Sequence, residues 1–244
     1  FESIYYDTEK EPWEWVQDFL TNYISDEKLE YLQMFHLSRR LDGTDIKINN
    51  NLQKLLIEET PISKFFKKYN ITFKKRDNHI DIFWDNKLQV LNEEYGNDSG
   101  NVYYLRWRLG YNEEQDYCVN GFAFRSYLEK NDYFRTLSRC PELVDNIERI
   151  MNIYGMSEDY YNNSKYYCIE YLIPIKEIIF DINNPPNTEV DKTFEFVKYA
   201  ILRLYDSWRE SSFVCDENLI LRLADDANIK EEWFINAEEI VTIG

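Results

Sequence analysis

Side chains that could carry out chemistry are few in this sequence, which has only two histidines, His36 and His79. His79 stands between Asp77 and Asp81, and the alternation along a predicted strand would point all three side chains to one face. Carboxylate oxygens and an imidazole nitrogen at that spacing could hold a divalent metal ion. The group has no clear fourth ligand, and any solvent-facing strand alternates in this way. We therefore treat Asp77, His79 and Asp81 as weak metal candidates and expect no bound cofactor.

The same region is similar to the acid–lysine tail of metal-dependent nucleases. Asp77 and Asp81 precede the triplet Asp85-Asn86-Lys87. Asp85-Asn86 is typical of a turn, whereas that chemistry is carried out in the middle of a strand. A nuclease would also need a locally basic channel in a chain of net charge −17. A metal-dependent nuclease is accordingly one form of an enzymatic alternative.

The other histidine, His36, lies beside Ser38, Arg39 and Arg40 in a segment with helical spacing. A helix histidine of this kind is most often a structural residue that hydrogen-bonds to the backbone. The triplet His36-x-Ser38 resembles the His or Arg strand with which NAD-dependent ADP-ribosyltransferases begin. The resemblance implies ADP-ribosyl transfer, a catalytic Glu toward the end of the chain, and a strand at His36, where the spacing predicts a helix. If the protein is an enzyme, His36, Arg39 and His79 are the candidate catalytic residues.

Sequence motifs for nucleophilic, phosphate-binding and redox chemistry are absent. The chain contains no G-x-S-x-G, no Walker glycine loop, no G-x-G-x-x-G and no H-E-x-x-H. Its seven glycines leave little material for the close backbone approach that phosphate loops need. These absences favour a non-catalytic binding protein over an enzyme.

The charge balance indicates what such a protein would bind. The sequence has 28 Lys and Arg residues against 45 Asp and Glu residues, a net charge of −17. Such a field repels nucleic acid and anionic membranes and speeds association with basic partners. We therefore expect a protein partner with a basic surface, and no direct contact with nucleic acid or a membrane.

Paired tyrosines and alternating arginines supply the candidate contacts. Tyrosine offers a large contact area with few rotatable bonds, which makes it a favoured interface residue. Two arginines on a predicted strand could bind an anion, although cross-strand ion pairs are the more common use of such residues. The candidate binding residues are Tyr103, Tyr104, Arg106, Arg108, Tyr160 and Tyr161.

One basic segment interrupts the acidic background. Its cations alternate with aromatic residues, a combination that can bind nucleic acid. The interpretation we prefer is a solvated face that pairs with acidic neighbours in the same chain. The cations are Lys64, Lys67, Lys68, Lys74, Lys75 and Arg76.

These observations predict a non-catalytic inhibitor or regulator that docks through an acidic, tyrosine-rich surface. Its partner would be a nucleic-acid-processing or defence enzyme, of the kind that phages or mobile elements antagonise, and a homo-oligomer is compatible with this function. An enzyme of the ADP-ribosyltransferase or metal-dependent nuclease type is the alternative, and a structural subunit is a third hypothesis. Four cysteines without a C-x-x-C pair, and no apolar run of about 18 residues, predict a cytoplasmic location.

The elements that must position these residues follow a helix–sheet–helix order. Apolar spacing predicts helices within residues 12–20, 25–41, 52–56 and 60–70. Alternation then predicts a three-stranded meander within residues 71–91, with turns at 77–78 and 85–86, and strands at 102–109 and 118–124. The remaining predicted elements are helices at 128–138, 141–154, 191–211 and 219–227, and strands at 166–173, 175–181 and 235–243.

This order predicts an α+β fold with N-terminal helices, a central mainly antiparallel sheet and a long C-terminal helix. The Asn-Asn-Pro-Pro-Asn sequence at 183–187 is the strongest predicted linker. We therefore expect a helical part over 1–70, a sheet core over 71–182 and a helical part over 188–244 that returns to the sheet. A single domain that contains all three parts is equally compatible.

Overall fold

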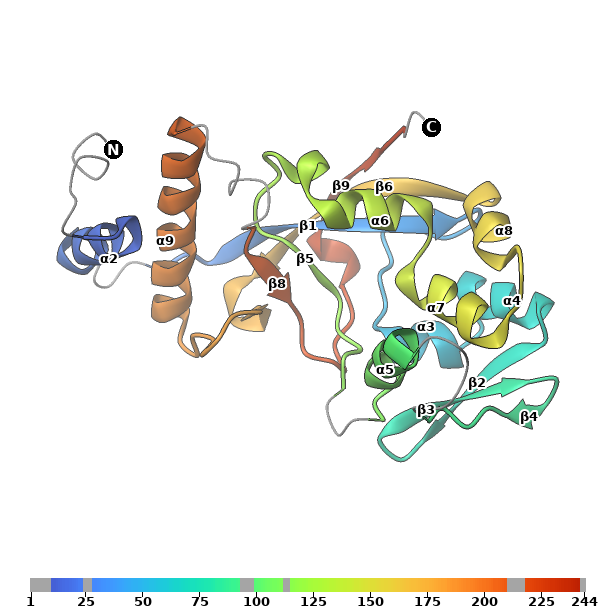
Figure 1. Ribbon diagram of the computed structural model, residues 1–244. Helices are drawn as coiled ribbons and strands as arrows, with labels where there is room; N and C mark the ends of the chain where they lie inside the picture. Colours follow the sequence, from blue (N-terminus) through green and yellow to red (C-terminus); the bar gives the residue numbers. More distant parts are fainter. Residues whose placement is uncertain (1–9, 24–27, 93–98, 112–114, 210–217, 242–244) are drawn as a thin grey trace.

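The computed structural model describes residues 10–23, 28–92, 99–111, 115–209 and 218–241. The fold is α+β and confirms the predicted class: helices accompany a six-stranded antiparallel sheet and a separate three-stranded sheet, and a long helix lies near the C-terminal end (Figure 1). No helix in the described ranges has an apolar stretch of the length that spanning a bilayer requires.

The large sheet has the strand order β7-β8-β5-β1-β6-β9. Its central ladder joins β1 to β6 over eleven residues of each strand, from Tyr31↔Pro174 to Leu41↔Ser164. The strands are β1 (Tyr31–Leu41), β5 (Asn120–Phe122), β6 (Ser164–Pro174), β7 (Ile179–Phe180), β8 (Ile220–Arg222) and β9 (Phe234–Glu239).

The other side of β1 is only briefly paired. β1 and β5 share the single pair Phe35↔Phe122, so the second half of β1 has no strand beside it on that side. Gly121 makes the close approach at this junction possible, because a Cβ at that position would lie 2.7 Å from the Phe35 carbonyl oxygen. The large sheet is therefore open between the second half of β1 and the chain that leads into β5.

The small sheet consists of β2 (Ile71–Arg76), β3 (His79–Trp84) and β4 (Lys87–Leu88), which confirms the predicted meander. Its turns contain Asp77, Asp85 and Asn86, with φ of 48°, 48° and 63°. Asn and Asp tolerate this left-handed conformation better than other non-glycine residues. The predicted turn chemistry at 77–78 and 85–86 is thus confirmed.

Helices cover the small sheet and build one hydrophobic core with it (Figure 1). These helices are α3 (Leu52–Ile57), α4 (Pro61–Lys68), α5 (Ser99–Arg108), α7 (Glu142–Met151) and α8 (Met156–Asn162). α4 begins with a reciprocal cap, in which Ser63 N donates to Thr60 Oγ1 and Thr60 N donates to Ser63 Oγ. Phe66, Ile71 and Ile82 are fully buried in this core.

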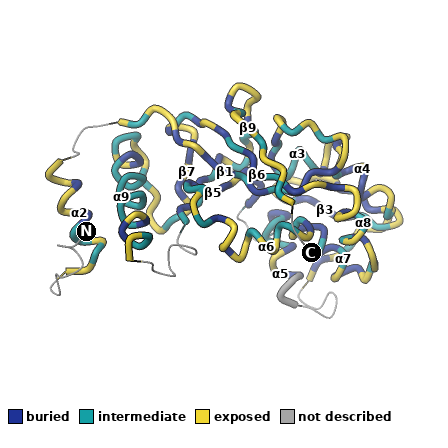
Figure 2. The backbone as a smooth tube through the Cα atoms, turned by 90° about the horizontal axis from the view of Figure 1, so that it is seen from above, coloured by how far each residue is buried: buried dark blue, intermediate teal, exposed yellow. Residues whose placement is uncertain are grey.

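A second core lies on the large sheet, whose far end carries α9 (Glu189–Trp208) with α2 (Pro12–Tyr23) packed against it (Figures 1 and 2). Lys192 of α9 fixes the helix to the sheet, because its Nζ donates to the Ile175 carbonyl oxygen at 3.2 Å. The remaining short elements are α6 (Asp132–Arg139), η1 (Leu128–Lys130), η2 (Ile175–Glu177) and η3 (Glu231–Trp233).

Three predicted elements have the wrong type. Residues 25–41 contain the strand β1 rather than a helix. Both faces of β1 are packed, with Met34 in one core cluster and Leu37 in another. The sequence of β1 therefore lacks the alternation of polar and apolar residues that marks a half-exposed strand. Residues 219–227 contain β8 rather than a helix.

The predicted strand at 102–109 is the helix α5. Val102, Leu105 and Leu109 are fully buried at a spacing of three and four residues, while Tyr103 and Tyr104 are exposed. That spacing defines one face of a helix, and the apparent alternation of Tyr103, Leu105, Trp107 and Leu109 is coincidental.

Candidate ligand pocket

A cavity of about 230 Å³ lies at the opening in the large sheet. Residues 36–41 of β1 line it on one side and residues 118–120 on another, so the cavity occupies the place where β5 fails to continue beside β1. His36, Ser38 and Arg40 share one face of β1, because side chains alternate along a strand. The opening therefore places a histidine and an arginine in the wall of one cavity.

Arg40 is the most unusual residue of this wall. It is only 8% exposed, and its Nε and Nη2 atoms make no hydrogen bond of good geometry, although the guanidinium lies within reach of the Tyr171 hydroxyl. No carboxylate of the described residues forms an ion pair with it. A buried charge without a counter-charge is strongly unfavourable, and buried donors are normally satisfied. Arg40 is therefore the residue of this wall that most favours the binding of an anion.

Arg39, the neighbouring candidate, is buried to the same degree but is fully engaged. Its guanidinium donates to Ser164 Oγ at 3.0 Å, to the Ser164 carbonyl oxygen at 2.7 Å and to the Tyr161 carbonyl oxygen at 3.1 Å. It also stacks on the Tyr161 ring, 4.2 Å from the ring centroid. Arg39 thus ties β1 to the end of α8 and has little capacity left for a ligand.

His36 adds a neutral acceptor beside Arg40. Its Nδ1 lies 2.6 Å from the Asn120 carbonyl oxygen, and because a carbonyl can only accept, Nδ1 carries the proton. Burial and the positive charge of Arg40 lower the pKa of His36 to about 4, against the opposing effect of the Asn120 hydrogen bond. The imidazole is consequently neutral at pH 7, and its Nε2 is left as an acceptor.

Two further buried polar groups have unused hydrogen-bonding capacity near Arg40. The side-chain nitrogen of Asn49, which lines the cavity, and the hydroxyl of Tyr171 both lack a partner with good geometry. Arg40 and Asn49 both lie within reach of the Tyr171 hydroxyl as side-chain donors, although neither contact has the geometry of a good hydrogen bond. Burial nevertheless raises the pKa of Tyr171 to about 12, so its hydroxyl keeps its proton. The cavity wall therefore offers a cation, additional donors and one neutral acceptor.

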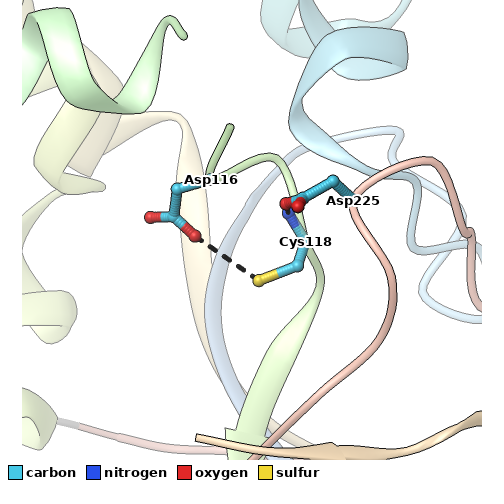
Figure 3. A group of neighbouring side chains, drawn as sticks. All are labelled: Asp116, Cys118 and Asp225. Carbon is cyan, nitrogen blue, oxygen red and sulfur yellow. Dashed lines mark hydrogen bonds between the residues drawn. The ribbon is translucent and has the colours of Figure 1, made fainter. Parts of the chain in front are cut away.

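A cluster of Asp116, Cys118 and Asp225 supports the cavity wall at Cys118 (Figure 3). It is the one group of three potential metal ligands that the described part of the chain brings within 4.8 Å. Its oxygens already have protein partners: Asp225 accepts from Tyr117 N at 2.8 Å and Cys118 N at 3.1 Å, and Asp116 pairs with Arg108 and accepts from the Cys118 thiol. Burial raises the pKa of Cys118 to about 12, so the thiol is protonated. These contacts are those of a structural cluster.

The candidate metal ligands lie elsewhere, in the small sheet. His79 Nε2 is 3.2 Å from Asp81 Oδ1, while Asp77 belongs to the turn that precedes β3. The buried Asp81 carboxylate also accepts from Tyr111 Oη at 2.8 Å and pairs with Arg76 at 3.1 Å. Asp77, His79 and Asp81 are therefore not gathered into one ligand group, and the two histidines lie in different sheets.

The six candidate binding residues divide between two helices and the interior. Tyr103 and Tyr104 are 61% and 50% exposed on α5, and Tyr161 of α8 is partly exposed. Tyr160 is buried, and its hydroxyl donates to the Arg39 carbonyl oxygen at 3.1 Å. The two remaining residues, Arg106 and Arg108, bond to the Leu91 carbonyl oxygen and to Asp116.

Sequence reasoning noticed Arg40 only as a neighbour of His36 and did not single out Asn49. The alternation of His36, Ser38 and Arg40 would have indicated a shared face if the segment had been assigned as a strand. Comparison with family models, with curated proteins and with solved structures found no match to this chain.

Proposed function

We propose that the protein is a nucleotide-using transferase of the ADP-ribosyltransferase type, and that the pocket beside β1 holds part of NAD. The observation that carries this proposal is the buried guanidinium of Arg40 in the cavity wall, which has no carboxylate partner among the described residues and two nitrogens without a hydrogen bond of good geometry. A phosphate is the anion that best complements such a planar group of donors. The neutral His36 beside it can accept from a sugar hydroxyl.

The position of His36 also supports this class. The resemblance of His36-x-Ser38 to ADP-ribosyltransferases implies a histidine on a strand, and His36 lies on β1. The cavity volume of about 230 Å³ is smaller than that of a typical ligand pocket, roughly 300–1,000 Å³. In this proposal the pocket encloses the phosphate and ribose part of NAD, and the rest of the dinucleotide extends out of it.

The chemistry of the proposed reaction is a substitution at the ribose carbon that carries nicotinamide. The carbon–nitrogen bond breaks, nicotinamide leaves, and an acceptor nucleophile forms the new bond to the same carbon. The resemblance implies a catalytic Glu late in the chain. The glutamates that follow the start of the long helix by more than twenty residues are Glu210, Glu217, Glu231, Glu232, Glu238 and Glu239, of which Glu210 and Glu217 lie outside the described residues.

Arg40→Met tests the proposal, with Arg39→Met as a matched control on the same strand. We expect Arg40→Met to weaken NAD binding at least tenfold in equilibrium titration. Its free energy of unfolding should stay unchanged or rise by about 1 kcal/mol, because an uncompensated buried charge is removed. Arg39→Met should instead lose about 3 kcal/mol of stability, because it leaves buried carbonyl groups without their donor.

The outcomes distinguish which ligand the pocket binds from which reaction the protein catalyses. Absence of NAD binding by the unmodified protein, or equal NAD affinity in Arg40→Met, would overturn the proposal. Binding of inorganic phosphate or ADP without binding of NAD would retain an anion pocket but reject the transferase. Replacement of each late glutamate by Gln should identify one variant that binds NAD and no longer releases nicotinamide.

Docking on a basic protein partner remains our second proposed function. The observation that favours it is the exposure of the adjacent Tyr103 and Tyr104 on α5, whose rings contact each other edge-on with centroids 5.9 Å apart. The net charge of −17 would speed association with a basic partner, and the two tyrosines would supply the aromatic contact. This function does not require the pocket.

A further inference from the structure

The charge of the chain is unevenly distributed, and the small sheet lies in its most basic part. Residues 61–91 contain seven Lys and Arg residues and three Asp residues, a net charge of +4 in a chain whose total is −17. The cations on the strands of the small sheet lie on both of its faces. One face packs on the core through Ile71, Phe73 and Ile82, and the other is turned away from that core.

The outward face carries cations and aromatic rings in one continuous strip. Lys74 and Arg76 of β2 lie opposite Asp81 and His79 of β3. Lys74 Nζ is 4.6 Å from the centroid of the Phe83 ring. We call this surface the cation–aromatic strip, and it consists of Lys74, Arg76, His79, Phe83, Arg106 and Tyr111.

Tyr111 joins the helix α5 to this strip. Its ring is 4.3 Å from the His79 ring and 5.4 Å from the Arg106 guanidinium. Both Arg106 and Arg76 act electrostatically on the Tyr111 hydroxyl. Two cations of different elements therefore flank one aromatic ring.

The strip keeps a net positive charge. Its one carboxylate, Asp81, has a side chain that is only 5% exposed, and it is engaged by Arg76, His79 and Tyr111. Lys74 and Arg106 form no ion pair with any described carboxylate. Three permanent cations thus face one buried anion, and the side chain of Arg76 is 60% exposed.

We propose that the cation–aromatic strip binds single-stranded nucleic acid. Phosphates would contact Lys74, Arg76 and Arg106, and a base would stack on Phe83, while Tyr111 holds His79 and Arg106 in place. The net charge of −17 does not forbid this contact, because charges more than about 8 Å away are largely screened at physiological ionic strength. The proposal replaces the expectation, drawn from the total charge, that the protein avoids nucleic acid. It does not depend on the pocket beside β1.

A labelled oligothymidine of 12 nucleotides provides the test, with fluorescence anisotropy in about 50 mM and 200 mM salt. We expect binding at the lower salt concentration and a loss of at least tenfold at the higher one. Lys74→Gln should weaken binding at least fivefold. Lys75→Gln is the matched control, because Lys75 lies on the opposite face of the same strand and bonds to Gln53; its affinity should stay within twofold.

Phe83→Leu separates stacking from charge. It keeps an apolar side chain and removes the ring, so oligothymidine binding should weaken at least fivefold while the fold is retained, as judged by circular dichroism. A labelled polyglutamate peptide tests for an acidic protein partner instead. Binding of that peptide as tight as binding of oligothymidine, equal losses in Lys74→Gln and Lys75→Gln, or no binding at 50 mM salt would each overturn the proposal.

Discussion

Arg39 and Arg40 are neighbours on β1 and are 7% and 8% exposed, yet only one of them has its hydrogen bonds satisfied. A hydroxyl and several peptide carbonyls take up the donors of Arg39, whereas two nitrogens of Arg40 make no hydrogen bond of good geometry. Residue type and burial therefore do not distinguish a structural arginine from a candidate for ligand binding. The identity of the partners does.

His36 gives the protein a specific dependence of stability on pH. Its folded pKa of about 4 lies below the value of about 6.5 expected in the unfolded chain. Between these values the unfolded state takes up a proton that the folded state refuses, so the free energy of unfolding should fall as pH decreases from 6.5 to 4, by up to about 3 kcal/mol. Above pH 6.5 His36 should have no effect.

Denaturant titrations of the unmodified protein and of His36→Gln, at pH values between 7.5 and 4.5, measure this contribution. Gln keeps an N–H that can donate to the Asn120 carbonyl oxygen but cannot titrate. The variant should therefore lose less stability than the unmodified protein over the acidic range. Parallel curves for the two proteins would show that His36 is not protected from protonation.

Elements with strong local signals were predictable from sequence. The Thr60-Pro61 start of α4 and the Asp and Asn turns of the small sheet are encoded by residues within a few positions of one another. The long apolar stripe that predicts residues 191–211 as helical corresponds to α9. Such signals persist because tertiary packing does not alter them.

Elements with long-range partners were not predictable in the same way. β1 is a strand because β6, more than 120 residues later, pairs with it, and β8 is a strand because β5 and β7 flank it. The pocket depends on this pairing too, since it exists where β5 stops following β1. Sequence reasoning could therefore suggest His36 but could not place it beside Arg40 and Asn49 in one cavity.

Gly121→Ala tests the junction between β1 and β5 at the scale of the element. The added Cβ would lie 2.7 Å from the Phe35 carbonyl oxygen and 2.8 Å from Met34 Cγ, so the strands must separate or shift. We expect a loss of about 1–3 kcal/mol in the free energy of unfolding by urea titration, and weaker ligand binding in the pocket.

Gly43→Ala is the control for the junction variant. A Cβ added at Gly43 would meet nothing within 4 Å, but the residue has a φ of +81°, so its replacement costs only backbone strain of about 1 kcal/mol. This control should leave ligand affinity unchanged. If Gly121→Ala is no less stable and binds ligand no more weakly than Gly43→Ala, the close approach of β5 to β1 is not required.

At the scale of the whole molecule, the surplus of negative charge affects association more than folding. A protein partner held by this charge should bind more weakly as salt increases, because screening shortens the reach of the field. Affinity for a captured basic partner, measured at about 50 mM and 300 mM salt, should fall at least tenfold. Tyr103→Ala should weaken the same binding, because Tyr103 is exposed. Tyr160 is not replaced, because it is buried and cannot contact a partner. An affinity independent of salt would contradict the acidic docking function.

The single residue pair between β1 and β5 has a consequence for the molecule. Backbone pairing divides the large sheet into two groups of strands, β1, β6 and β9 in one and β5, β7 and β8 in the other, which share a core that contains Met34 and Leu221. A ligand that binds in the cavity would therefore contact both groups of strands at once.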